Sequence, residues 1–225
     1  MSIILQVDTA TEKAHVGIAR DGRLVQVQWS NSQKDHASFL QAAVAELAQK
    51  EGISLGDIDA VSVTMGPGSY TGLRVGMASA KGLCYVLGKP LIALNTLEVI
   101  ALSTIMETGA GEEILFCPMI DARRMEVFTA VYDRERNLIL EPCAMVLDDG
   151  SFTNFLSEGR VVFSGNGAAK FQAVCTDPNA RFSDITVTAE AMAALSAEYF
   201  ASGRFADLAY TEPLYIKEFQ DFNNR

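Results

Sequence analysis

Histidine is too scarce in this sequence to form a metal centre of imidazole ligands. The 225 residues include two histidines, His15 and His36, and neither belongs to an H-E-x-x-H motif. A G-x-S-x-G elbow is also missing, and Ser69 has no histidine near it in the sequence to serve as a base. These absences argue against a metallopeptidase and against a serine hydrolase.

The sequence also lacks closely spaced cysteine pairs and has fewer positive than negative charges. The cysteines form no C-x-x-C pair, and we expect buried reduced thiols at Cys84, Cys117, Cys143 and Cys175. With 18 Lys and Arg against 28 Asp and Glu, the formal net charge is -10. Such a surface repels phosphate backbones, so any nucleic acid that the protein serves is expected to be held mainly by a partner.

The N-terminal segment lacks the features of an export signal or a membrane anchor. After Met1 the sequence reads Ser2-Ile3-Ile4-Leu5-Gln6-Val7, with no basic segment and an apolar run too short to cross a bilayer. We therefore expect a cytoplasmic protein that does not associate with membranes.

Apolar patterning predicts an α/β fold. Continuous or alternating apolar runs predict strands at residues 3–7, 14–18, 24–29, 58–64 and 91–94. Helical spacing predicts helices at residues 36–50, 71–87 and 96–108, with Asp35 as the N-cap of the first.

The later part of the sequence repeats this order in a shorter form. Strands are predicted at residues 114–120, 127–131 and 161–164, and the last one enters a second glycine turn at 165–167. The stretch 140–159 has little room for a long helix, and a late helix is predicted at 190–202. We infer a duplication with an abbreviated second half, divided after Thr108 into domains 1–108 and 109–225.

The turn from Gly66 to Gly72 is the first candidate site. It joins a strand to a helix N-terminus, where backbone N–H groups and the helix dipole attract anions. It has no Walker lysine and no dinucleotide-type spacing, so a tight bend that requires glycine is an equal alternative. After the first strand, hydroxyls are placed to hold phosphate and a carboxylate to hold hydrated magnesium. The predicted nucleotide cleft, weak or vestigial, comprises Asp8, Thr9, Thr11, Gly66, Gly68, Ser69 and Thr71.

Asp121 takes the place of Asp8 in the second half, but Ala122-Arg123-Arg124 replaces the hydroxyls there. The two arginines have two interpretations. They fill a phosphate cleft, or they form structural ion pairs with Asp8, Glu12 or Glu126.

The helices predicted at 36–50 and 71–87 have broad apolar or small-residue faces. Either they cover their own sheet, or a surplus of this surface binds a partner, as in a four-helix contact between two subunits. The candidate partner residues are Phe39, Leu40, Ala43, Leu47, Gly72, Val75, Gly76 and Ser79.

Four segments together resemble the TsaB (YeaZ) family. They are residues 4–11, the glycine turn continued to Gly76, the segment Ile120 to Phe128, and Pro213-Leu214-Tyr215-Ile216-Lys217. The resemblance spans nearly the whole chain and weakens at 140–159 and after Lys217. It implies an actin-like ATPase (ASKHA) fold of two ribonuclease-H-like halves. It also implies a cytosolic bacterial subunit required for N6-threonylcarbamoyladenosine at position 37 of tRNAs that read codons beginning with adenine.

The resemblance further implies that this chain is not the catalyst. The related TsaD subunit carries an H-x-x-x-H metal pair, and Thr96 and Ile100 stand at the matching positions here, where neither can replace imidazole. We therefore expect a scaffold for a TsaD-type catalytic subunit, assisted by a TsaE-type ATPase, that meets tRNA indirectly and forms a homodimer when alone. The remaining cofactor hypothesis is weakly bound ATP or ADP with Mg at or near the partner interface.

A different class of function stays open on the residues alone. Asp8, Thr9, Thr11 and the glycine turns also fit an ATP-dependent phosphotransferase of the sugar or acetate kinase kind.

Overall fold

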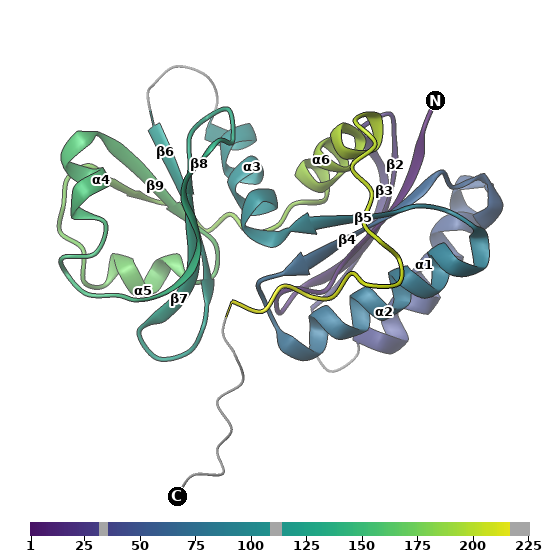
Figure 1. Ribbon diagram of the computed structural model, residues 1–225, viewed down its shortest axis with the longest axis horizontal. Coiled ribbons are helices and arrows are strands. Elements are labelled where there is room, and N and C mark those ends of the chain that lie inside the picture. The colour runs from purple at the N-terminus through teal and green to yellow at the C-terminus, as the bar shows by residue number, and fades with distance from the viewer. Residues whose placement is uncertain (32–35, 109–113, 217–225) are drawn as a thin grey trace, which may run out of the picture.

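The structure, a computed structural model, describes residues 1–31, 36–108 and 114–216, and within them two five-stranded sheets lie side by side (Figure 1). The first sheet has the order β3-β2-β1-β4-β5. Its strands are β1 (Ile3–Asp8), β2 (Ala14–Arg20), β3 (Arg23–Ser30), β4 (Ala60–Gly66) and β5 (Leu91–Asn95). The second sheet comprises β6 (Ile114–Asp121), β7 (Glu126–Tyr132), β8 (Leu138–Val146), β9 (Arg160–Ser164) and β10 (Ala180–Phe182).

The two sheets share one topology. Read as β8-β7-β6-β9-β10, the second sheet has the strand order of the first. In both, the first strand pairs antiparallel with the second and parallel with the fourth. This arrangement confirms the predicted duplicated α/β fold.

The second half is shorter than the first mainly in its helices. The first half has α1 (His36–Glu51), a short 3-10 turn η2 (Leu55–Asp57), α2 (Tyr70–Leu87) and α3 (Thr96–Thr108). The second half has α4 (Thr153–Glu158), α5 (Ala168–Gln172) and α6 (Ala189–Ala201). Helices α4 and α5 have 6 and 5 residues where α1 and α2 have 16 and 18, so helices cover less of the outer face of the second sheet.

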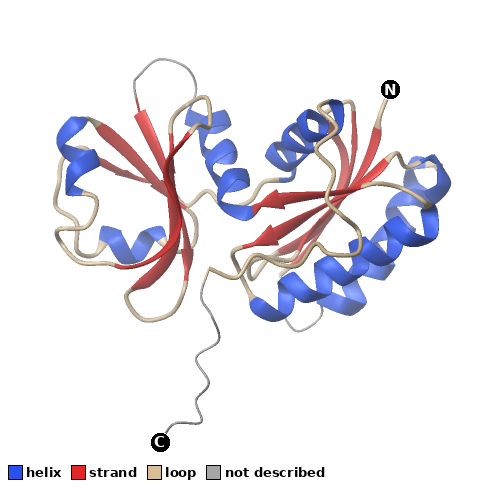
Figure 2. Ribbon diagram, in the orientation of Figure 1, coloured by secondary structure: helices blue, strands red, loops and turns tan. Residues whose placement is uncertain are grey.

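The helices form layers around the sheets (Figures 1 and 2). Helices α1 and α2 cover the outer face of the first sheet, and α4 and α5 lie along the outer face of the second. Between the sheets, α3 packs mainly on β6 of the second half, whereas α6 packs on β1, β2 and β3 of the first. Each half thus contributes a helix to the other, and one apolar core joins Ile4, Phe116 and Leu195. The division after Thr108 stays a prediction, and each of these two helices packs on the sheet on the other side of it.

A polar network fixes the two crossing helices to each other. Arg136, in the β7–β8 turn, pairs with Glu98 of α3 at 3.3 Å and also with Glu198 of α6. The hydroxyl of Tyr199 on α6 donates to the second oxygen of Glu98 at 2.8 Å. Arg136 and Glu98 are less than one-fifth exposed, so this network lies partly inside the joint.

Some elements differ from the sequence predictions. Strand β8 was not predicted, because Pro142 interrupts its apolar pattern; proline is tolerated there since β8 is an edge strand. Strand β10 was also missed, because three residues carry no periodicity. Cys84 and Cys117 are buried as predicted, whereas the prediction of burial was wrong for Cys143 and Cys175, which are partly exposed. The Asp35 N-cap lies outside the described residues.

Burial raises the pKa of the Cys84 thiol to about 11 and that of Cys117 to about 12, so both remain protonated at neutral pH. No helix in the described ranges combines the length and apolar character needed to cross a bilayer.

Candidate functional site

The glycine turn between β4 and α2 is closed by the chain's own backbone. The amide of Ser69 donates to the carbonyl of Ala10, in the β1–β2 hairpin, at 2.7 Å. A Cβ atom added at Gly68 would lie 2.3 Å from that carbonyl oxygen, a distance that real side chains do not adopt. An amide that an anion would use is therefore occupied by Ala10.

Helix α2 begins in equally close contact with Thr9. The Thr9 hydroxyl donates to the carbonyl of Gly72 at 2.7 Å, while the Ser69 hydroxyl caps the helix by accepting from the Gly72 amide at 3.3 Å. A Cβ at Gly72 would lie 2.1 Å from the Thr9 carbonyl oxygen, and one at Gly76 2.3 Å from the Thr9 hydroxyl. Both glycines are thus required by packing within the chain.

Asp8 is buried beneath this contact, with 1% of its surface exposed. One carboxylate oxygen accepts from the Thr64 hydroxyl at 2.6 Å and from the Ala10 amide at 3.1 Å, and the other lies 3.6 Å from Nδ1 of His15. Burial acts to raise the pKa of Asp8, but the neighbouring His15 imidazole, with the hydrogen bonds from Thr64 and Ala10, holds it below its ordinary value of 3.8. The carboxylate stabilises the fold and does not face solvent.

The remaining predicted cleft residues are spread around the turn. Thr11 is nearly buried, and its hydroxyl donates to the Lys13 carbonyl at 3.3 Å, whereas Thr71 is exposed. Gly66 has a φ of 118°, and a Cβ there would lie 2.6 Å from the carbonyl oxygen of Leu214. The turn thus brings the predicted residues together, but it is packed on both sides.

The segment after α6 covers the turn from outside. The amide of Leu214 donates to the Met65 carbonyl at 2.7 Å, and the ring centroids of Tyr215 and Tyr70 lie 5.3 Å apart. Lys81 of α2 donates to the carbonyl of Thr211 at 3.0 Å. Sequence reasoning assigned no role to this strap, residues 206–215, whose contacts are mostly through backbone groups that leave no side-chain signature.

The second glycine turn repeats the closure of the first. The Gly167 amide donates to the Met119 carbonyl at 3.0 Å, and a Cβ at Gly165 would lie 2.2 Å from that oxygen. Asp121 accepts from Lys170 at 2.8 Å and from the Arg123 amide at 2.6 Å. Partial burial acts to raise the pKa of Asp121, but Lys170 and the Arg123 amide hold it below its ordinary value.

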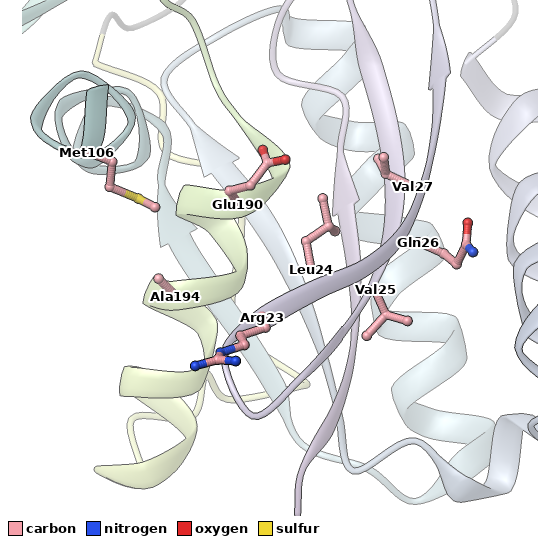
Figure 3. Close-up of a pocket in the computed structure, with 9 residues that line it drawn as sticks. Arg23, Leu24, Val25, Gln26, Val27, Met106, Glu190 and Ala194 are labelled. Atoms are coloured by element: carbon pink, nitrogen blue, oxygen red, sulfur yellow. The ribbon is translucent and has the colours of Figure 1, made fainter. Parts of the chain in front are cut away.

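Outside the glycine turns, we consider the positions of Thr96 and Ile100, metal sites, and a hollow beside β3. Thr96 and Ile100 lie in the first turns of α3, both buried in the core between the sheets. Within the described ranges, no three His, Cys, Asp or Glu side chains gather as a metal site would require. A hollow of about 430 Å³ beside β3 contains Glu190 and Arg23, whose charged groups point apart (Figure 3). None of its lining residues belongs to the glycine turn.

Comparison with known proteins gives the family. The family model of TsaD, tRNA N6-adenosine threonylcarbamoyltransferase, matches residues 27–211. The tRNA threonylcarbamoyladenosine biosynthesis protein TsaB of Escherichia coli K12 is 30% identical over 221 residues, covering 95% of this chain and 94% of that protein. The chain belongs to the TsaB (YeaZ) family.

Two further comparisons agree with this assignment. TsaB of Bacillus subtilis 168 is 30% identical over 136 residues, or 60% of this chain and 57% of that protein. The solved structure of YeaZ from Pseudomonas aeruginosa covers 96% of this chain and all of its own, with a TM-score of 0.83 at 25% identity. This likeness confirms the predicted actin-like fold class.

The partner residues predicted for this family member divide into two groups. Leu40, Ala43 and Leu47 are at most 2% exposed and pack on the first sheet, and Gly72 and Gly76 press on Thr9. Phe39, Val75 and Ser79 are partly exposed. The buried group serves the interior of the chain, because an amphipathic helix turns its apolar stripe toward its own sheet.

Helices α1 and α2 also expose apolar surface at positions other than the predicted partner residues. A groove of about 620 Å³ between α1 and α2 is lined by Val44, Ala78, Gly82, Leu83 and Val86, among others. Tyr85 and Val86 are each 81% exposed. Sequence reasoning did not select these residues; the available signal was an apolar pair on the face of α2 opposite the buried Met77, Ala80 and Cys84.

Gly72 and Gly82 of α2 have different surroundings, so replacing each of them by alanine should have opposite effects on stability. Gly72→Ala should destabilise the protein by about 1–3 kcal/mol, because its Cβ meets the Thr9 carbonyl. Gly82→Ala, with no atom within 4 Å of the new Cβ, should stabilise it by about 0.5–1 kcal/mol through helix propensity. Urea unfolding measures both; equal effects would show that the close contact with Thr9 is wrong.

The depressed pKa of Asp8 predicts a pH-dependent loss of stability. A folded-state pKa below 3.8 means that ionised Asp8 stabilises the fold above that pH, and that this stabilisation is lost as the pH falls through the lower folded value. Asp8→Asn should therefore cost roughly 1–3 kcal/mol at pH 7, and the difference from the parent should shrink below about pH 4. Asp149→Asn, at an exposed position, is the matched control. A pH-independent difference would contradict the lowered pKa of Asp8.

Proposed function

We propose that this chain is a non-catalytic subunit in the formation of N6-threonylcarbamoyladenosine in tRNA, and that it activates a TsaD-type catalytic subunit together with a TsaE-type ATPase. One observation carries the proposal: the Ser69 amide bonds to Ala10 within a chain that is similar to TsaB along nearly its full length. The fold retains the parts of a nucleotide cleft but uses them for its own packing.

The chemistry of the site supports the non-catalytic role. Asp8 is buried and bonded to Thr64 and Ala10, so its oxygens do not face a hydrated cation. Thr96 and Ile100 supply a hydroxyl and a hydrocarbon where the family resemblance places metal-binding histidines in the catalytic subunit. We propose that any ATP or ADP with Mg binds weakly, at or near the partner interface.

The surface of α1 and α2 supports a protein partner. The groove between them is lined by the exposed Val86 and by the small residues Ala78 and Gly82, and the exposed Tyr85 precedes Val86 on α2. Small residues allow a second helix to approach closely, and exposed apolar surface favours association. Since no described atom lies within 4 Å of a Cβ added at Gly82, its lack of a side chain suits an outside contact. We propose this face for the TsaD-type subunit and, when the chain is alone, for a second copy.

Reconstitution tests the function. A TsaD-type subunit, a TsaE-type subunit, tRNA, ATP and threonylcarbamoyl adenylate are combined with and without this chain, and modified adenosine is quantified by mass spectrometry. We expect turnover to fall at least tenfold without the chain. Equal turnover in its absence would refute the proposal. Heat-denatured chain serves as the control for protein addition.

A substitution in the groove tests the interface. Gly82→Trp should leave the circular dichroism spectrum unchanged but weaken association with the TsaD-type subunit about tenfold or more, because indole fills the groove. Gly150→Trp, in an exposed turn of the second half, is the matched control. Co-elution and turnover unchanged by Gly82→Trp would place the partner on another surface.

A further inference from the structure

Two successive arginines hold a strained backbone at the tip of the β6–β7 hairpin. Arg123 has a φ of 72° and Arg124 a φ of 48°, both in the left-handed region. Hairpin positions of this kind normally carry asparagine or glycine, because a bulky side chain crowds its own backbone there. Strained backbone conformations at such residues cluster at active sites and ligand clamps.

The other non-glycine residues of positive φ in the described chain have structural reasons for it. Asp21 precedes a glycine in a turn and accepts from the Ser2 amide at 2.7 Å. Arg136 joins α3 and α6 through Glu98, and Phe152 packs on buried aromatic rings. Arg123 and Arg124, by contrast, are exposed, and the ion pairs among described residues do not include them. The predicted structural pairing with Asp8, Glu12 or Glu126 is not seen in the part of the chain that the structure describes.

Hydrogen bonds fix the backbone of the hairpin tip that carries these side chains. The Glu126 amide donates to the Arg123 carbonyl at 3.1 Å, and the Arg123 amide donates to Asp121. The Asp121 amide in turn donates to the side chain of Asn166, in the second glycine turn, at 3.0 Å. The backbone of the arginine pair is therefore tied to two neighbouring segments.

The local charge is positive although the chain as a whole is acidic. Lys170 donates to the Asp121 carboxylate at 2.8 Å and to the Glu126 carbonyl at 2.9 Å, so the Asp121 carboxylate, two residues before Arg123, already has a cationic partner. Among the described residues, no ion pair includes the guanidinium groups of Arg123 and Arg124, so their donors face a ligand outside the chain. A guanidinium group fits a phosphate with two parallel hydrogen bonds.

We propose that Arg123 and Arg124 bind phosphate groups of the tRNA backbone. This inference rests on the proposed function, in which tRNA is the substrate of the complex, and it gives this acidic chain a direct contact with that substrate. The groove between α1 and α2, proposed for the protein partner, lies on the outer face of the first sheet, whereas the arginine pair belongs to the second half (Figure 1). A protein partner on the first half leaves the hairpin available to RNA.

Fluorescence anisotropy with labelled tRNA over a salt series tests the proposal, with the full chain alone and with the assembled complex. R123Q/R124Q should lower tRNA affinity about tenfold at low salt and reduce the slope of log K against log salt by roughly 1.5–2. R23Q removes one exposed arginine of β3 and should change neither quantity. R123G/R124G should lose the same affinity while the melting temperature rises by about 2–4 °C, because glycine relieves the backbone.

Two results would overturn the assignment. One is an unchanged affinity and salt slope for R123Q/R124Q. The other is that the same variant, without RNA, no longer associates with the protein partners, which would make the pair a protein contact. Binding requires no turnover, so the reconstitution assay judges the proposed function separately.

Discussion

The close contact between the glycine turn and the β1–β2 hairpin governs the rest of this structure. Gly68, Gly72 and Gly76 allow the turn and the start of α2 to press on Thr9 and Ala10, and the Ser69 amide bonds to the Ala10 carbonyl. Where a helix N-terminus binds phosphate, amides of this kind point at the ligand. Here the same contact fixes the position of α2, and with it the groove that α2 forms with α1.

The exchange of helices between the halves makes the chain one unit. Helix α3 packs on the second sheet and α6 on the first, so neither sheet completes its inner face with helices of its own half. After α6 the chain runs back over the first half, where Leu214 bonds to Met65 at the glycine turn. The turn thus contacts both the strap and the β1–β2 hairpin, two segments distant in sequence.

Periodicity predicted most of the fold, because strands and helices that cover a buried face have regular apolar spacing. It failed at β8, where Pro142 interrupts the pattern, and at the three-residue β10. The sequence located the candidate site, but it could not predict whether the site is open to a ligand or filled by the chain itself. Gly72 and Gly82 look alike in the sequence, yet one meets Thr9 and the other faces open space. For the same reason, the apolar stripe of α1 does not indicate whether this helix packs on its own sheet or on a partner.

The glycine turn that was predicted to bind nucleotide is filled by the chain's own packing. Isothermal titration calorimetry of the isolated protein with Mg-ATP tests this conclusion most directly. Because Asp8 is buried and the Ser69 amide is bonded to Ala10, we predict no saturable heat of binding up to roughly millimolar nucleotide. Saturable binding at micromolar nucleotide that is lost in a folded Asp8→Ala variant would contradict the account and favour a phosphotransferase.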